Sequence, residues 1–194
     1  MTEALVYFSR KGVTGLTMLK SVKLLYLADR YHMLRYARPV VGGEYSCLKY
    51  GPVPLQSYDV ISNAIAGSDD EVASDDKFAE AIEVRRNANF ANPLLVARRD
   101  PDTSVFSESD IEALDHVVRE FGPLKACDIV ELTHKHAAWN QTEAEQGIGR
   151  SSAIPYERFF ADDPEKYRNS LEVAILEQED RDATEMLLES ADRG

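Results

Sequence analysis

The sequence has few cysteines and no long apolar run. Its two cysteines, Cys47 and Cys127, lie far apart and form no CxxC pair, so we expect two reduced thiols rather than a disulfide. The apolar stretch near the N-terminus, residues 4–8, is too short for a secretion signal or a membrane span. We therefore expect a cytoplasmic protein with no membrane partner.

The sequence also lacks the common motifs of catalysis and cofactor binding. The patterns GxSxG, GxxxxGKS/T and GxGxxG and the calcium-binding EF-hand loop are all missing. These patterns build a nucleophile elbow, a phosphate cradle, a dinucleotide turn and a calcium site. Because none of them occurs, we expect no cofactor and a function other than catalysis.

Basic residues are outnumbered by acidic ones. The chain has 22 Lys and Arg against 34 Asp and Glu, a formal net charge of -12, which repels a phosphate backbone, so nucleic acid is not expected as a partner. Acidic residues gather in an expected loop over residues 67–77 and along residues 162–192. We expect these segments to contact a basic protein partner; the alternative is a solvated face that only keeps the protein soluble. The candidate partner-binding residues are Asp69, Asp70, Glu71, Glu177 and Asp180.

The first 50 residues are an exception to this acidity. Their only acidic residues are Glu3, Asp29 and Glu44. Their basic residues are Arg10, Lys11, Lys20, Lys23, Arg30, Arg35, Arg38 and Lys49. The charge of the chain is therefore unevenly distributed along the sequence.

The length and composition indicate one core. A chain of 194 residues with 44% hydrophobic residues can fold without a disulfide or a metal. Apolar residues at three- and four-residue spacing predict helices, and the strongest, over 17–38, ends before Pro39. The expected fold class is α+β, predominantly α-helical, a compact single domain with two small antiparallel β-hairpins. The other expected helices cover residues 2–10, 55–66, 107–121, 124–136, 155–160 and 162–190.

The two hairpins are expected from turn residues between short apolar runs. The first pairs residues 40–41 with 45–50 around a two-glycine turn, because both glycines can adopt a positive φ. The second pairs residues 81–85 with 93–98. Residues 50–54 contain two prolines, which lack a backbone donor, so this segment is expected to be a rigid corner rather than a strand.

A carboxylate stands beside the apolar stripe of the long helix. Asp29 follows Tyr26 by three residues, on the same side of the helix. A buried carboxylate is costly unless a donor partners it. We expect its partners among tyrosine hydroxyls, the backbone amides of residues 50–53, or His134. Replacement of Asp29 by Ala is then expected to cost about 1–3 kcal/mol of stability.

Two histidines and the single tryptophan lie close together at the end of the expected helix 124–136. His134 and His136 are two residues apart and Trp139 follows, so a metal or general-base site has to be considered. Residues two apart point to different sides of a helix, whereas a helical metal pair uses four-residue spacing. We therefore expect no metal and a His134 that hydrogen-bonds within the fold. A hydrolase centred on His134, with Cys47 as nucleophile, is the remote alternative.

The helix over 124–136 also permits a DNA-binding interpretation. After the turn at residues 121–124 it could be the second helix of a helix-turn-helix. Its Lys125 and Lys135 are opposed by acidic neighbours, so a packing helix is the preferred interpretation.

Four blocks of sequence occur in a characteristic order. They are Lys23-Leu24-Leu25-Tyr26-Leu27-Ala28-Asp29-Arg30, Lys49-Tyr50-Gly51-Pro52-Val53-Pro54, Phe106-Ser107-Glu108-Ser109-Asp110, and Leu132-Thr133-His134 followed by Ala138-Trp139. Together they resemble the signature of the Panacea domain family, the SocA-like antitoxins that also include phage-associated proteins. The similarity spans about residues 16–140, and a glycine pair at 42–43 departs mildly from the family pattern. We assign residues 1–160 to this domain and 161–194 to an acidic C-terminal helix, packed on the domain or facing the partner.

The resemblance implies an antitoxin of a toxin–antitoxin system, which neutralises a cognate protein toxin encoded by an adjacent gene. The founding member of the family also delivers its toxin to the ClpXP protease. A second role as a proteolytic adaptor, with ClpXP as a partner, is therefore a further implication of the resemblance. The alternative is a phage-associated regulatory or DNA-binding protein. The family signature residues, expected to be structural, are Tyr26, Asp29, Tyr50, Gly51, Pro52, Val53, Thr133, His134 and Trp139.

Overall fold

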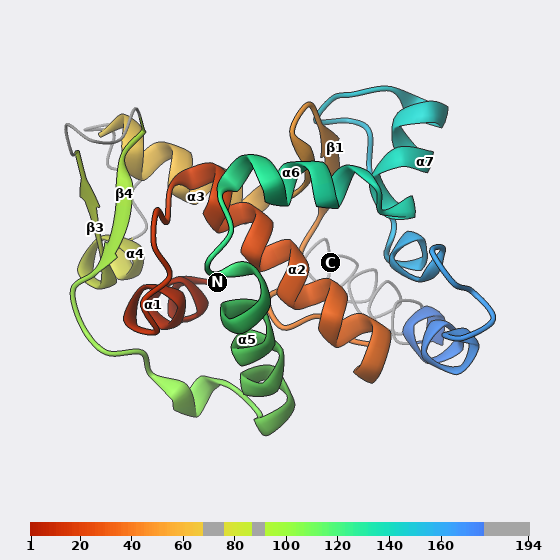
Figure 1. Cartoon of the computed structure of the whole chain (residues 1–194), viewed down its shortest axis with the longest axis horizontal. Helices are drawn as coiled ribbons and strands as arrows, with labels where there is room; N and C mark the ends of the chain where they lie inside the picture. Colours follow the sequence, from red (N-terminus) through yellow and green to blue (C-terminus); the bar gives the residue numbers. More distant parts are fainter. Residues whose placement is uncertain (68–75, 87–91, 177–194) are drawn as a thin grey trace, which may run out of the picture.

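The computed structural model of the chain describes residues 1–67, 76–86 and 92–176 (Figure 1). In chain order its elements are α1 (Thr2–Arg10), α2 (Met18–Tyr36), β1 (Tyr45–Leu48), β2 (Gly51–Pro54), α3 (Leu55–Ala66), α4 (Asp76–Ala81), β3 (Ile82–Arg85), β4 (Leu94–Ala97), the 3₁₀ helix η1 (Thr103–Val105), α5 (Glu108–Phe121), α6 (Ala126–His134), α7 (Ala137–Gln146) and the 3₁₀ helix η2 (Tyr156–Phe160). Two antiparallel sheets of two strands each, β1–β2 and β3–β4, accompany the helices. The expected class, α+β and mostly helical, is confirmed. None of the helices in the described ranges is both long and apolar enough to cross a membrane.

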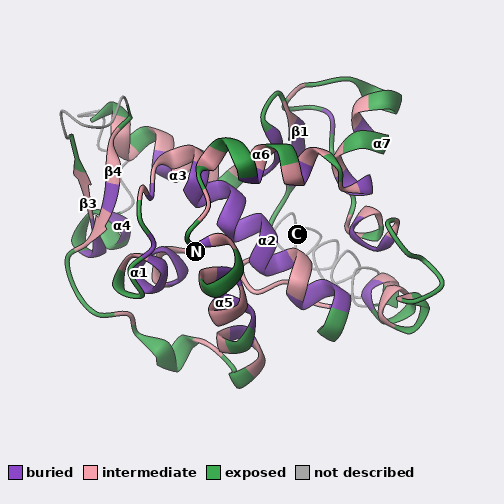
Figure 2. Cartoon of the chain, in the orientation of Figure 1, coloured by how far each residue is buried: buried purple, intermediate pink, exposed green. Residues whose placement is uncertain are grey.

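Helix α2 forms the centre of the molecule, and most of it is buried (Figures 1 and 2). The Thr17 side chain accepts a hydrogen bond from the backbone N–H of Lys20 and caps the start of α2, as expected. At the other end, Ala37 adopts a left-handed φ of 62°, and its N–H donates to the Met33 carbonyl. Helices α3, α5 and α6 and strand β2 all pack against α2. Polar side chains along α2 are therefore buried and need partners inside the fold.

Lys20 illustrates this requirement. Its side chain is almost fully buried, and its Nζ donates to the carbonyls of Thr14, Gly122 and Leu124 over 2.7–2.8 Å. Two of these carbonyls follow the C-terminal end of α5, where backbone acceptors have no partner within the helix. Lys20 thereby fixes the end of α5 to the start of α2.

The first predicted hairpin is wrong in its register. Strands β1 and β2 pair around a turn at residues 49–50, not around the glycine pair at 42–43. Residues 40–42 form no strand, because the carboxylate of Asp29 accepts hydrogen bonds from their backbone amides. A side chain of α2 therefore occupies the donors that a neighbouring strand would have used.

The rigid corner predicted for residues 50–54 is also wrong, since most of it is strand β2. Pro52 and Pro54 lie opposite Cys47 and Tyr45 in the ladder. Backbone groups of Cys47 and Tyr45 bond away from β2. The two prolines thus occupy positions of the ladder at which no backbone donor is required, so their missing N–H groups cost nothing.

The outer side of β1 is covered by a later segment of the chain. The N–H of Cys47 donates to the Ser152 carbonyl, and its carbonyl accepts from Gly149. The carbonyl of Tyr45 accepts from the N–H of Ile154. Residues 149–154 therefore act as an irregular third strand beside β1.

The second half of the chain follows the sequence predictions more closely. Ser107 and Asp110 form a capping box at the start of α5, and the helix ends at Phe121, before the expected Gly-Pro stop. The second hairpin forms as β3–β4 within the predicted ranges. The short helix predicted over 155–160 is the 3₁₀ helix η2.

Other helix boundaries differ from prediction. Helix α4 begins at Asp76, inside the segment predicted as a loop through residue 77. The helix predicted over 124–136 ends at His134, and α7, which was not predicted, begins at Ala137. The helix predicted from residue 162 is helical over 168–176, and its remainder lies outside the described residues.

Candidate functional site

The nine signature residues come from segments that meet around α2. They lie on α2 (Tyr26, Asp29), in the turn before β2 (Tyr50), on β2 (Gly51, Pro52, Val53), on α6 (Thr133, His134) and on α7 (Trp139). Helix α2 packs against β2 and α6, and α7 packs against both β1 and β2. We use the name polar cluster for five polar side chains between these elements, the buried Lys23, Tyr26, Asp29 and Tyr45 and the half-buried His136.

Asp29 binds the loop that follows α2. One carboxylate oxygen accepts from the N–H groups of Val40 and Val41 at 2.8 and 2.7 Å. The other accepts from the N–H of Gly42 at 2.8 Å and from the Tyr45 hydroxyl. Burial raises the pKa of Asp29, and these four hydrogen bonds oppose that shift. The carboxylate therefore joins α2, the loop and β1.

The prediction that Asp29 has hydrogen-bond partners inside the fold is confirmed. A tyrosine hydroxyl is one of them, as expected, and it belongs to Tyr45. The predicted partners His134 and the amides of residues 50–53 are wrong, because the amides come from residues 40–42. The glycine pair at residues 42–43, both with a positive φ, was the sequence feature that could have indicated this loop as the binding partner of Asp29.

Tyr26 pairs with His136, a histidine that the sequence interpretation placed second to His134. The Tyr26 hydroxyl lies 3.0 Å from Nδ1 of His136. Burial lowers the pKa of His136 to about 4, so the ring is neutral at neutral pH and its Nδ1 can accept a hydrogen bond from the hydroxyl. The Tyr26 ring also contacts the rings of Tyr45 and Phe159, with centroids 5.9 and 5.3 Å apart. This contact ties α2 to η2.

Lys23 is a further buried group, and sequence reasoning did not single it out. Its Nζ donates to the Pro52 carbonyl at 2.7 Å, and burial lowers its pKa to about 7. Gly51 has a φ of +103°, and a Cβ there would lie 2.8 Å from both Lys23 Nζ and Thr133 Oγ1. Only glycine fits this position, because the backbone of β2 approaches α2 and α6 closely.

His134 and Trp139 form the outer edge of this region. Their rings stack with centroids 3.9 Å apart and an interplanar angle of 19°, and the Trp139 indole N–H donates to the Leu48 carbonyl at 2.9 Å. Thr133 is buried and donates to the Val130 carbonyl. Tyr50, at the tip of the hairpin, is 55% exposed. The site thus holds the hairpin in place and presents an aromatic side chain to solvent.

The geometry does not pair Cys47 with His134 as the hydrolase alternative requires. Cys47 is buried, its pKa is raised to about 11, and its Sγ lies 3.7 Å from the Trp139 carbonyl oxygen. The His134 side chain has its Nε2 buried without a hydrogen-bond partner in the part of the chain that the structure describes. Over those same ranges no group of three or more His, Cys, Asp or Glu could hold a metal ion. Cys47 and Cys127 are both free thiols, as predicted.

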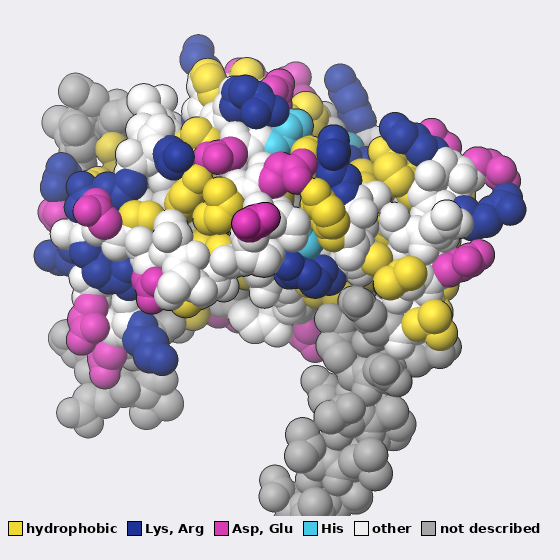
Figure 3. All heavy atoms as spheres, turned by 90° about the horizontal axis from the view of Figure 1, so that it is seen from below, with side chains coloured by type: hydrophobic (Ala, Val, Ile, Leu, Met, Phe, Trp, Pro, Cys, Tyr) yellow, Lys and Arg dark blue, Asp and Glu magenta, His cyan; other side chains and the backbone are white. Residues whose placement is uncertain are grey.

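The acidic residues expected to bind a partner are not among those that the structure describes. Asp69, Asp70, Glu71, Glu177 and Asp180 all lie outside the described residues. On the face shown in Figure 3, basic and acidic side chains are interspersed. That face therefore presents no extended patch of one sign, such as a nucleic-acid-binding surface requires.

Comparison with known proteins finds a family model that matches this chain. The family model described as Antitoxin SocA-like, Panacea domain, matches residues 22–140. The matched segment is more than half of the chain and contains most of α2, the first hairpin, α5 and α6. No curated protein and no solved structure matches the chain.

Proposed function

The chain belongs to the Panacea-domain family of SocA-like antitoxins, and on that premise we propose that it neutralises a protein toxin by binding it directly. The family match over residues 22–140 is the observation that carries this proposal. The matched blocks coincide with the residues that position the hairpin on α2, including Asp29 and Gly51. An inhibitor that acts by binding needs such a fixed surface more than it needs reactive groups.

We propose binding rather than catalysis as the mode of action. Cys47 and His134, the candidate nucleophile and base, form no hydrogen bond with one another. The histidine with the most strongly lowered pKa, His136, bonds to Tyr26 within the fold. These groups support the structure of the domain, which is consistent with a partner-binding protein.

We propose further that the toxin is encoded by a gene adjacent to this one and that both proteins meet in the cytoplasm. Delivery of the toxin to ClpXP is a second step that the same complex would allow. It predicts that the toxin disappears faster in cells that contain both this protein and the protease than in cells that lack either one.

The test is co-expression with each neighbouring open reading frame. One neighbour should arrest the growth of cells when it is induced alone. Cells that also express this protein should grow normally, and the two proteins should co-purify. A matched control is the Asp29→Ala variant, which should lose rescue in proportion to its loss of folded protein. If neither neighbour is toxic or bound, the proposal is wrong.

A further inference from the structure

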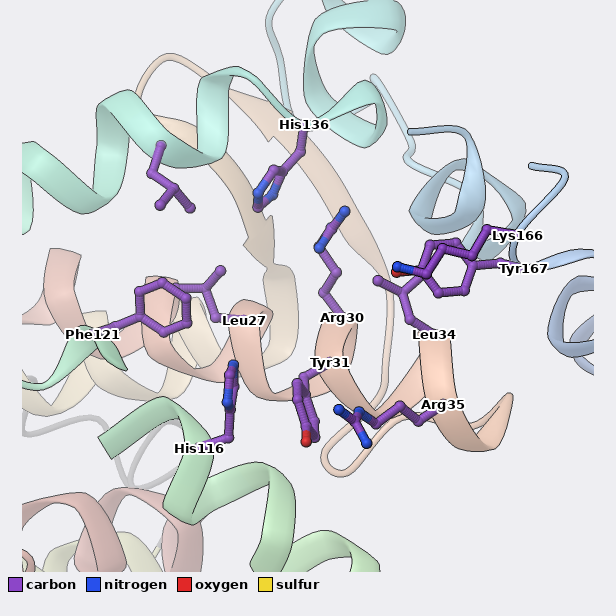
Figure 4. Close-up of a pocket in the computed structure, with 11 residues that line it drawn as sticks. Leu27, Arg30, Tyr31, Leu34, Arg35, His116, Phe121, His136, Lys166 and Tyr167 are labelled. Carbon is purple, nitrogen blue, oxygen red and sulfur yellow. The ribbon is translucent and has the colours of Figure 1, made fainter. Parts of the chain in front are cut away.

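A groove runs along the C-terminal half of α2. It encloses about 460 Å³ and is lined by side chains of α2, α5, α6 and the segment after η2 (Figure 4). In Figure 4, Arg30 rises from α2 between His136 on one side and Lys166 and Tyr167 on the other. We refer to this space as the cationic groove.

The charge of the cationic groove is opposite to that of the chain. Arg30, Arg35 and Lys166 line it, and no Asp or Glu does, whereas the whole chain carries a net charge of -12. The two lining histidines, His116 and His136, have pKa values lowered chiefly by burial, so both are largely neutral at neutral pH. The positive charge therefore comes from the arginines and the lysine.

Two of the three cations, Arg30 and Arg35, each have one carboxylate neighbour, and Lys166 has none among the described residues. Arg30 uses one Nη2 hydrogen for Asp162, at 2.7 Å, and its Nε has no hydrogen-bond partner within the described ranges. Arg35 lies 3.5 Å from Glu112 at the rim. Lys166 is exposed, its Nζ lies 5.0 Å from the centre of the Tyr167 ring, and it forms no ion pair among the residues that the structure describes. An anionic group entering here would meet the exposed ammonium of Lys166, and it would compete with Asp162 and Glu112 for the two arginines.

The rest of the groove wall is apolar. Leu27, Leu34 and Leu132 line it together with the rings of Phe121 and Tyr167. Apolar walls next to cationic side chains suit an amphipathic ligand, because the apolar part is removed from water while the charge is matched. A free inorganic anion would leave these walls uncovered.

We propose that the cationic groove binds a peptide segment of a partner protein in which acidic side chains alternate with large apolar ones. This inference rests on the proposed function, since it names the part of the toxin that the antitoxin would grasp. Charge complementarity selects the occupant: a basic segment would meet three cations at short range. Asp162 and Glu112 offset part of the groove's positive charge at short range. The more distant negative charges of the chain oppose the attraction less, because salt screens charges that lie beyond about 10 Å.

The first test uses two labelled peptides of about 12 residues, one alternating Glu with Leu and Phe, the other with Lys in place of Glu. Fluorescence anisotropy with the full chain should show roughly tenfold tighter binding of the acidic peptide, and this binding should weaken as salt rises. The Arg30 Nε–H signal in a nitrogen–proton NMR spectrum should shift on titration. Equal binding of both peptides, or an unmoved Arg30 signal, would overturn the proposal.

Two variants locate the binding. Lys166→Gln changes an exposed side chain and should leave the fold intact, and Arg30→Gln removes the central donor. Each substitution should lower the affinity for the acidic peptide at least roughly fivefold. The control is Arg85→Gln, an exposed arginine on β3 that pairs with Glu83 and does not line the groove. A full-affinity Lys166→Gln variant, or an equal loss in the Arg85→Gln control, contradicts the inference.

The outcomes separate this inference from the proposed function. If a neighbouring toxin is neutralised equally well by Arg30→Gln and Lys166→Gln proteins, the groove inference fails while the antitoxin function stands. If no neighbour is toxic but the acidic peptide binds in the groove, the function fails and the peptide site stands. An Arg30 shift that grows with protein concentration alone assigns the groove to a second copy and overturns the proposal.

Discussion

Removal of the Asp29 carboxylate tests whether the polar cluster stabilises the domain. The side chain is fully buried and accepts four hydrogen bonds, three from the amides of residues 40–42 and one from the Tyr45 hydroxyl. Asp29→Ala removes both acceptor oxygens and with them all four hydrogen bonds. The substitution also removes a buried charge whose raised pKa shows that burial opposes its ionisation.

The expected loss follows from these contacts. The Tyr45 hydroxyl is buried, and leaving it without an acceptor costs about 1–3 kcal/mol. The three amides are partly buried, so water can replace the carboxylate in part, and we assign them together about 2 kcal/mol. Relief from the buried charge offsets some of this. The net loss is about 2–4 kcal/mol, somewhat above the sequence-based value.

Urea unfolding followed by circular dichroism measures this loss. With a slope of roughly 2 kcal/mol per molar urea, the midpoint should fall by about 1–2 M. Asp29→Asn is the matched control, because its amide oxygen still accepts while its NH₂ group faces the remaining donors, so its loss should be smaller. A midpoint for Asp29→Ala within about 0.3 M of the wild type would refute the role of the carboxylate.

Three other predictions concern single residues. Because the folded pKa of Lys23 is about 7 and its ordinary value is 10.5, the unfolded chain binds more protons between these values, so stability should rise from pH 7 to 9; Lys23→Met should remove this rise in urea midpoints. Gly51→Ala should cost roughly 1–3 kcal/mol in thermal unfolding, and Gly12→Ala, with a φ of +81° but no atom near the new Cβ, should cost less. With Ellman's reagent, exposed Cys127 should react rapidly and buried Cys47 only after unfolding; equal rates would contradict the described burial.

Elements whose ends carry local signals could be predicted from the sequence. Helix α5 begins with a side-chain cap at Ser107 and ends at a Gly-Pro pair, so its bounds follow from contacts between near neighbours. The hairpin β3–β4 is likewise formed by adjacent segments. The resemblance carried by the four blocks agreed with the family match over residues 22–140.

The register of the first hairpin could not be predicted, because distant groups determine it. The amides of residues 40–42 are taken by Asp29, eleven or more positions earlier. Pro52 fits a strand only because its β1 partner, Cys47, bonds outward to Ser152, about a hundred residues away in the chain. The pairing of His136 with Tyr26 depends on a turn between α6 and α7 that helical periodicity does not reveal.

The irregular strand at residues 149–154 sets the shortest piece of this chain that is worth expressing. The family-matched segment stops at residue 140. A fragment cut there would leave the outer groups of Cys47 and Tyr45 unpaired, and an open strand edge promotes association between molecules. It would also lose Phe159, whose ring lies 5.1 Å from that of Tyr45. Such a fragment is expected to aggregate, so its failure to bind a toxin would say nothing about the binding surface; truncations for partner mapping should retain residues through η2.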